Sequence, residues 1–98
     1  MMSNEKSPKE EQFVEISIST TAGFYPAEGF ERAPVHQKVS VLLEKAQKEL
    51  NIKDIAGWIA TVTDGSGKRQ VDPARSYLDN GLSGKVEIDW GPSEGGGG

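Results

Sequence analysis

The chain has 98 residues, a formal net charge of -4 and no cysteine. A length of this order is typical of one domain, and an acidic balance without clustered Lys and Arg argues against binding to nucleic acid or to an anionic membrane. No run of about 18 apolar residues is present, so we expect no membrane span, and the absence of cysteine excludes disulfides and fits a reducing, cytoplasmic location.

The N-terminal part of the sequence predicts a polar lead and then a strand. Residues 1–12 are charged and polar, and we expect them to be a disordered lead to the folded domain. Residues 13–20, FVEISIST, alternate between apolar and polar side chains, which indicates a half-buried strand. Its inward residues are Val14, Ile16 and Ile18.

The next segment predicts a loop and a second strand. Residues 20–29, TTAGFYPAEG, contain two glycines and a proline and are interpreted as a loop longer than a tight hairpin turn. Residues 30–35, FERAPV, form a weaker strand pattern. Pro34 has no N–H to donate, so it must lie at the end or on the edge of that strand.

One long helix is predicted over residues 39–52, VSVLLEKAQKELNI. Apolar side chains recur there at helical spacing and charged ones fill the opposite face. Ser40 or Gln37 is a candidate for the N-cap, and Asn51 is a plausible stop signal. The apolar face consists of Val39, Leu42, Leu43, Ala46 and Leu50.

The C-terminal half predicts a hairpin, a loop and a last strand. Residues 57–71 contain a strand beginning near Trp58, a turn, and a short returning strand. The following loop carries Leu78 and Leu82, which we expect in the core. Residues 85–90, KVEIDW, alternate again and form the last strand, followed by a glycine-rich tail over residues 91–98. The folded domain therefore covers residues 13–90.

A single helix and one sheet must bury their apolar faces against each other, which predicts an α+β fold. One helix held by a mixed sheet of four to five strands is the β-grasp arrangement. Within it, GKRQVDPARSYLDNGLSGKVEIDW resembles the ubiquitin pattern: a Gly-Lys turn at Gly67-Lys68, a short strand, a Leu-containing turn and a last alternating strand. The final pair Gly97-Gly98 completes the resemblance to ubiquitin-like proteins, most of all to small bacterial ones.

This resemblance implies a protein modifier, not an enzyme, with no cofactor and no metal. Gly98 would be the acyl donor, activated by adenylation and joined through an isopeptide bond to lysines of target proteins, while Gly97 permits close approach. The implied partners are an adenylating (activating) enzyme, a conjugating enzyme and a deconjugating metalloprotease. A carboxylate is a poor electrophile, so activation must precede transfer to a partner's cysteine thiolate.

Two departures from the ubiquitin pattern concern recognition. Pro92, Ser93 and Glu94 replace basic and leucine-rich residues before the final glycines, so an activating enzyme would have to read an acidic tail at Glu94. Ubiquitin-like proteins bind partners through an aliphatic patch on the sheet, and in the last strand of this chain the position of that patch falls near Asp89. Dedicated partners are therefore expected.

Other chemistry is weakly indicated. His36 is the only histidine and lacks an evident nucleophile or acid, so a surface position is expected. Trp58 is interpreted either as a core residue or as a partner contact, because Trp is enriched at binding hot spots. Two alternatives to a modifier stay open: a sulfur carrier with a C-terminal thiocarboxylate, and an interaction domain with an inert tail.

Overall fold

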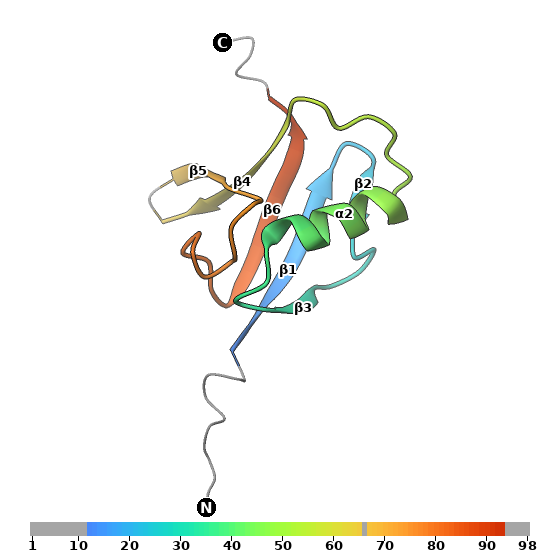
Figure 1. Cartoon of the computed structure of the whole chain (residues 1–98). Coiled ribbons are helices and arrows are strands. Elements are labelled where there is room, and N and C mark those ends of the chain that lie inside the picture. The colour runs from blue at the N-terminus through green and yellow to red at the C-terminus, as the bar shows by residue number, and fades with distance from the viewer. Residues whose placement is uncertain (1–11, 66, 94–98) are drawn as a thin grey trace, which may run out of the picture.

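The computed structural model describes residues 12–65 and 67–93. These residues form one helix and a mixed sheet, which is the predicted α+β, β-grasp arrangement (Figure 1). The elements in chain order are β1 (Phe13–Thr20), β2 (Gly23–Tyr25), β3 (Glu31–Pro34), α2 (Val39–Glu49), β4 (Trp58–Asp64), β5 (Gly67–Val71) and β6 (Lys85–Pro92).

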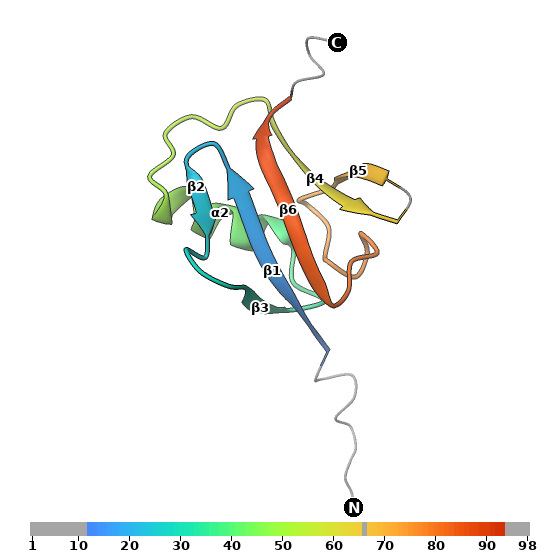
Figure 2. The ribbon, with the colours of Figure 1, turned by 180° about the vertical axis from the view of Figure 1, so that it is seen from behind.

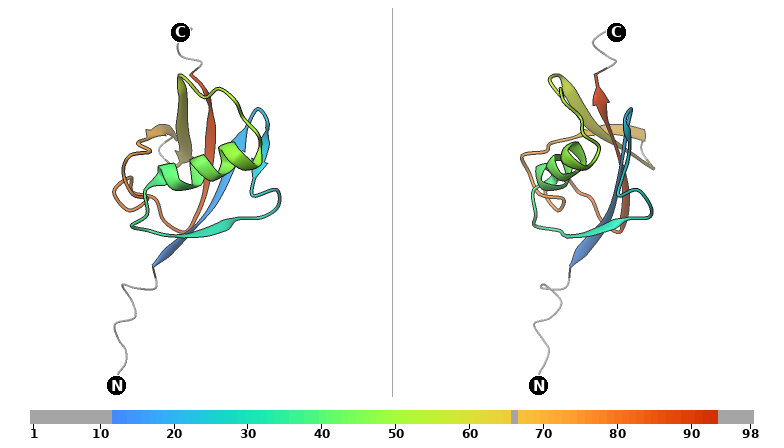
Figure 3. Two further views of the ribbon diagram at one scale, coloured as in Figure 1. Left: turned by 45° about the vertical axis from the view of Figure 1, so that its right-hand side comes forward. Right: turned by 90° about the vertical axis from the view of Figure 1, so that its right-hand side faces the viewer.

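The sheet has six strands, against the four to five predicted, and runs in the order β2-β1-β6-β4-β5. β3 also pairs with β1, so β2 and β3 share one side of β1 while β6 occupies the other. The pairing of β1 with β6 is parallel and every other pairing among the described strands is antiparallel. The helix covers one face of this sheet, and the other face is open, as Figures 2 and 3 show.

The segment predicted as a long loop contains β2, so that prediction was wrong. Thr20 and Gly23 close a tight turn: the Thr20 hydroxyl donates to the Gly23 carbonyl at 2.9 Å and accepts from the Ala22 N–H at 2.9 Å. Gly23 has φ +134°, a conformation that L side chains rarely adopt. A strand of three residues is too short to show alternation, which explains why the sequence pattern did not indicate it.

The helix confirms four residues of the predicted apolar face, since Val39, Leu42, Leu43 and Ala46 are buried, while Leu50 lies at the C-cap and is half-buried. α2 ends at Glu49, three residues before the end of the predicted range, and the predicted stop signal Asn51 follows the C-cap Leu50 with a φ of 56°. The Asn51 N–H donates to the Lys48 carbonyl and the Ile52 N–H to the Gln47 carbonyl, which is the hydrogen-bond pattern of a Schellman motif.

The start of α2 differs from both predicted caps. Lys38 is the N-cap residue and makes no side-chain capping bond. Instead the N–H of Val39 donates to the Arg75 carbonyl at 3.0 Å, and that of Ser40 to the Pro73 carbonyl at 2.9 Å. The loop between β5 and β6 thus satisfies N–H groups that a side chain usually caps, and no local sequence signal exists for such a cap.

The core lies between α2 and the covered face of the sheet. The predicted inward residues of the first and last strands are buried: Val14, Ile16, Ile18, Val86, Ile88 and Trp90. Leu82 is also buried, but Leu78 is 49% exposed, so its predicted core position was wrong. Its neighbour Tyr77 is fully buried instead. An irregular loop has no repeating pattern of inward and outward side chains, so the sequence did not show that Tyr77, and not Leu78, is the buried residue.

A series of polar side-chain contacts links β2, β3 and α2 at the rim of this core. The Tyr25 hydroxyl donates to Glu31 Oε1 at 2.7 Å, and Lys45 Nζ approaches Glu31 Oε2 at 3.2 Å. The hydrogen bond from Tyr25, with help from Lys45, holds the pKa of Glu31 below its ordinary value. Burial and Glu31 together raise the pKa of Tyr25 to about 12.

Tyr77 carries a hydroxyl without a hydrogen-bond partner in the described part of the chain. Burial raises the pKa of Tyr77 well above 10, and the nearby Gln37 side chain only partly opposes the rise. Because the unfolded phenol ionises near pH 10 while the folded one stays neutral, the free energy of unfolding must fall as the pH rises above about 10.

We predict that Tyr77→Phe raises the free energy of unfolding by about 1 kcal/mol at pH 7, since a buried hydroxyl without a partner costs desolvation. The variant should also lose stability less steeply above pH 10, with Tyr25 accounting for the remaining slope. Urea unfolding between pH 7 and pH 11 measures both effects. A Tyr77→Phe variant that is less stable than the original chain would show that the hydroxyl has a stabilising partner.

Candidate functional site

The predicted conjugation residues Gly97 and Gly98, and the predicted contact Glu94, lie outside the described residues. The structure does place the strand that leads to them. β6 extends to Pro92, two residues beyond the predicted strand end, because Gly91 pairs with Ile59 and Pro92 with Trp58. β6 pairs with β1 from Lys85 to Asp89 and with β4 from Ile88 to Pro92, so every residue of the strand has a partner on at least one side.

Trp58 lies beside the end of β6. Its ring packs edge-to-face against Trp90, with the ring centroids 5.1 Å apart and the planes at 84°. Trp90 is buried as predicted, and Trp58 is half-buried at the edge of the core. Trp58 thus has a packing role, while its role as a partner contact stays a prediction.

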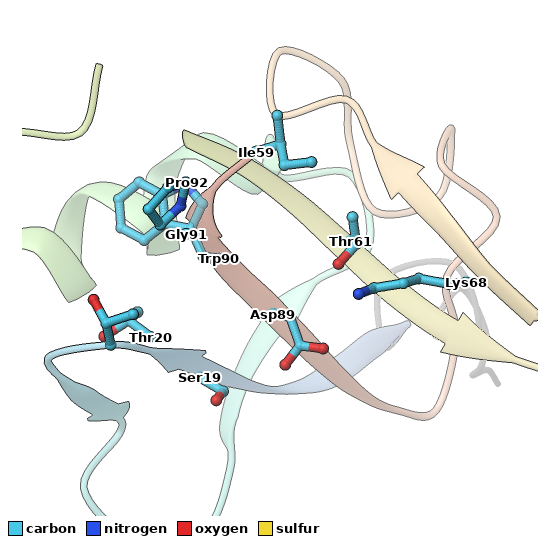
Figure 4. A pocket seen from close by; sticks show the side chains of 10 residues that line it. Ser19, Thr20, Ile59, Thr61, Lys68, Asp89, Trp90, Gly91 and Pro92 are labelled. Atoms are coloured by element: carbon cyan, nitrogen blue, oxygen red, sulfur yellow. The ribbon is translucent and has the colours of Figure 1, made fainter. Parts of the chain in front are cut away.

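A shallow hollow of about 520 Å³ lies on the open face of the sheet next to the end of β6. We call it the exit hollow. Its side chains come from β1, β4, β5 and β6 and from the turn after β1, as Figure 4 shows. The side chains that line it include Ser19, Thr20, Ile59, Thr61, Lys68, Asp89 and Pro92.

Several polar side chains line the exit hollow. Asp89 is exposed, and its neighbours across the strands are Ser19 on β1 and Thr61 on β4. Lys68 extends over the same face from β5 (Figure 4). Because the two side chains beside the Asp89 carboxylate are short, a side chain of a partner has room to approach it. The carboxylate accepts hydrogen bonds, so a cationic or amide donor is the group that would bind there.

Asp89 is thus an exposed polar residue on the open sheet face, and its correspondence to the aliphatic patch of ubiquitin stays a prediction. The sequence analysis missed Ser19, Thr61 and Lys68 as neighbours of this residue. Their outward parity in the strand patterns was visible, but the register that brings them together comes only from the strand pairing.

The described residues contain no group of three or more metal-ligating side chains. His36 is exposed, as expected. None of the described helices is both long and apolar enough to cross a membrane. The site thus combines exposed polar side chains with the end of the last strand. Its described part shows no set of nucleophile, base and stabiliser.

Neither a protein-family model nor a curated protein sequence matches this chain. Among solved structures, the chain is similar to the solution structure of a ubiquitin-like domain from tubulin-binding cofactor B. The TM-score is 0.63 and the identity 18%, over 87% of this chain and 94% of that one. At this identity the similarity shows the fold alone, and the fold of this chain is ubiquitin-like.

We predict that Trp58→Leu lowers the free energy of unfolding by about 1 kcal/mol, because the edge-to-face contact with Trp90 is lost. Trp58→Phe keeps an aromatic ring in place and serves as the matched control, with a smaller loss. Urea unfolding followed by Trp90 fluorescence measures both. If Trp58→Leu is as stable as the original chain, Trp58 has no packing role.

Proposed function

We propose that the chain is a ubiquitin-like protein modifier similar to small bacterial ones and acting in the cytoplasm. Its carboxyl group at Gly98 is adenylated by an activating enzyme, passed to a conjugating enzyme and joined to lysines of target proteins. A metalloprotease that cleaves the isopeptide bond would reverse the modification. The ubiquitin-like fold supports this proposal.

The observation that carries the proposal is where β6 ends. This strand lies in the middle of the sheet, paired with β1 and β4, and it ends at Pro92 beside the exit hollow. The six residues 93–98 span at most about 20 Å when extended. A partner docked on the open face is thus within reach of Gly98 without any unfolding of the domain.

The chemistry of the proposal takes place in the partners. The carboxylate of Gly98 attacks the α-phosphorus of ATP and pyrophosphate leaves. A partner's thiolate then displaces AMP, and a lysine amine finally displaces that thiolate, losing a proton as the amide forms. The chain has no cysteine, so it cannot form the thioester by itself.

The tail composition suits such transfers. Glycine has no side chain and adopts φ of either sign, so a glycine segment enters a channel that would exclude other residues. Glu94 is the one charged residue between Pro92 and Gly98. We propose that the activating enzyme reads Glu94 together with the polar exit hollow and with Trp58, in place of the basic tail and aliphatic patch of ubiquitin.

An interaction domain is the second candidate. The solved neighbour is described as a domain of tubulin-binding cofactor B, so the same fold occurs as a part of another protein. An interaction domain would bind its partner through the body, and the loss of Gly97 and Gly98 would leave its binding intact. No observation favours the sulfur-carrier alternative over these two.

The test is ATP–pyrophosphate exchange with the full chain and an adenylating enzyme from the same cells. We predict exchange that depends on the chain, and loss of at least about 100-fold when Gly97 and Gly98 are removed, because the acyl donor is then a different and more crowded residue. Glu94→Gln should raise the concentration for half-maximal exchange without abolishing it.

The controls separate the alternatives. A variant with one Ala added after Gly98 blocks the predicted donor while leaving the body unchanged, and it should be as inactive as the deletion. Equal exchange with the original and the deleted chains would contradict the proposal. Recovery of a chain with a thiocarboxylate at Gly98 would favour the sulfur carrier.

A further inference from the structure

A second feature of the open sheet face lies at the end opposite the exit hollow. β1 and β6 run parallel (Figure 2). Phe13 and Lys85 are therefore both located where these strands begin, and the exit hollow lies where they end. Phe13, Glu15, Phe30, Arg32 and Gly84 line a shallow hollow of about 440 Å³ there. We call Phe13, Phe30, Arg32 and Lys85 the aromatic–basic cluster.

Both cations of this cluster are held against aromatic rings. Arg32 Cζ lies 4.5 Å from the centroid of the Phe13 ring, and Lys85 Nζ lies 5.4 Å from that of Phe30. A cation–π contact restrains a long side chain while leaving its N–H groups free on the side away from the ring. Because Arg32 and Lys85 are already restrained, they lose less side-chain entropy when they bind an anion.

Among the described residues, the local charge at this cluster is positive, although the protein as a whole is acidic. Glu15 is the cross-strand neighbour of both Arg32 and Lys85, so one acid faces two bases. The ion pairs found among the described residues join Lys45 to Glu31 and Arg69 to Asp64, and neither base of the cluster takes part in them. The next acid on the open face of β6 is Glu87, two residues toward the exit hollow.

Phe13 adds an apolar contact, with 38% of its surface exposed. An occupant that fits both properties carries carboxylates beside an aromatic or aliphatic side chain. A long polyanion is a poor fit, because the chain carries a net charge of -4 and its remaining surface would repel a nucleic acid or an anionic membrane. A short peptide segment touches the cluster alone.

We propose that the aromatic–basic cluster is a docking site for an acidic peptide segment of a partner protein. The site is separate from the tail and does not depend on the proposed modifier function. Arg32 and Lys85 donate hydrogen bonds to two carboxylates of the segment, and the exposed edge of Phe13 packs against an apolar side chain between them.

The test is an NMR titration of the ¹⁵N-labelled full chain with a capped synthetic peptide of Glu residues flanking a single Tyr. We expect shifts of the amides of Phe13, Glu15, Arg32 and Lys85, while those of Thr61 and Asp89 stay in place. The double variant Arg32→Gln/Lys85→Gln keeps most of the aliphatic stems and should weaken binding at least about tenfold. Lys68→Gln removes a cation from the exit hollow and is the matched control, with unchanged affinity.

Four outcomes would overturn the proposal. Equal binding of a peptide with Gln in place of every Glu would remove the role of charge, and equal binding by the double variant would remove the role of the two bases. Shifts confined to residues 1–11 would place the peptide elsewhere on the chain. Concentration-dependent shifts of the cluster amides without peptide would identify a second copy of the chain as the occupant.

Discussion

The parallel pairing of β1 with β6 is the constraint on which the rest of the structure depends. It joins the first and the last strand of the domain in five register pairs, from Glu15 with Lys85 to Ser19 with Asp89. On the covered face the same register places Ile16 beside Val86 and Ile18 beside Ile88, all buried in the core under α2. Parallel strands need a long crossover, and the chain from β2 through α2 to β5 forms this connection. Because the two strands begin at one end and finish at the other, the pairing also separates the aromatic–basic cluster from the exit hollow.

Much of this architecture follows from periodic patterns in the sequence. Alternation identified β1 and β6, and the helical spacing from Val39 to Leu50 identified α2. The failures fall where no period exists. β2 has only three residues. In an irregular loop, Tyr77 is buried where Leu78 was expected to be. The helix N-terminus is capped by the carbonyl groups of Pro73 and Arg75, which are distant in sequence.

The candidate site was predictable to a smaller degree. Gly97, Gly98 and Glu94 were singled out from composition and resemblance, and they lie beyond the part of the chain that the structure describes. The exit hollow and the aromatic–basic cluster arise from cross-strand neighbours, such as Asp89 between Ser19 and Thr61. A sequence shows which residues face outward, but only the register shows which of them meet. Gly91 and Pro92 were taken for tail because neither residue is typical of a strand, yet β4 pairs with both.

In the proposed function, the folded domain (the body) and the residues after Pro92 (the tail) have different roles. In this proposal the body presents polar groups for recognition in place of the aliphatic ones of ubiquitin, and the tail would carry the reacting group into a partner's active site. Such a division suits a protein whose described residues hold no catalytic set, because every reactive group except one carboxylate is then supplied by partners. It also implies partners with specificity for this chain, since a partner selected for an apolar patch and a basic tail would leave Asp89 and Glu94 without donors.

The most direct measurement is mass spectrometry of proteins from cells that express the chain, digested with a glutamate-specific protease. Cleavage after Glu94 leaves residues 95–98 on any lysine to which Gly98 has been joined. The account predicts target peptides with a tetraglycine remnant on lysine, which disappear when the chain is absent or lacks Gly97 and Gly98. If the chain is recovered in quantity and no lysine carries this remnant, the account is contradicted.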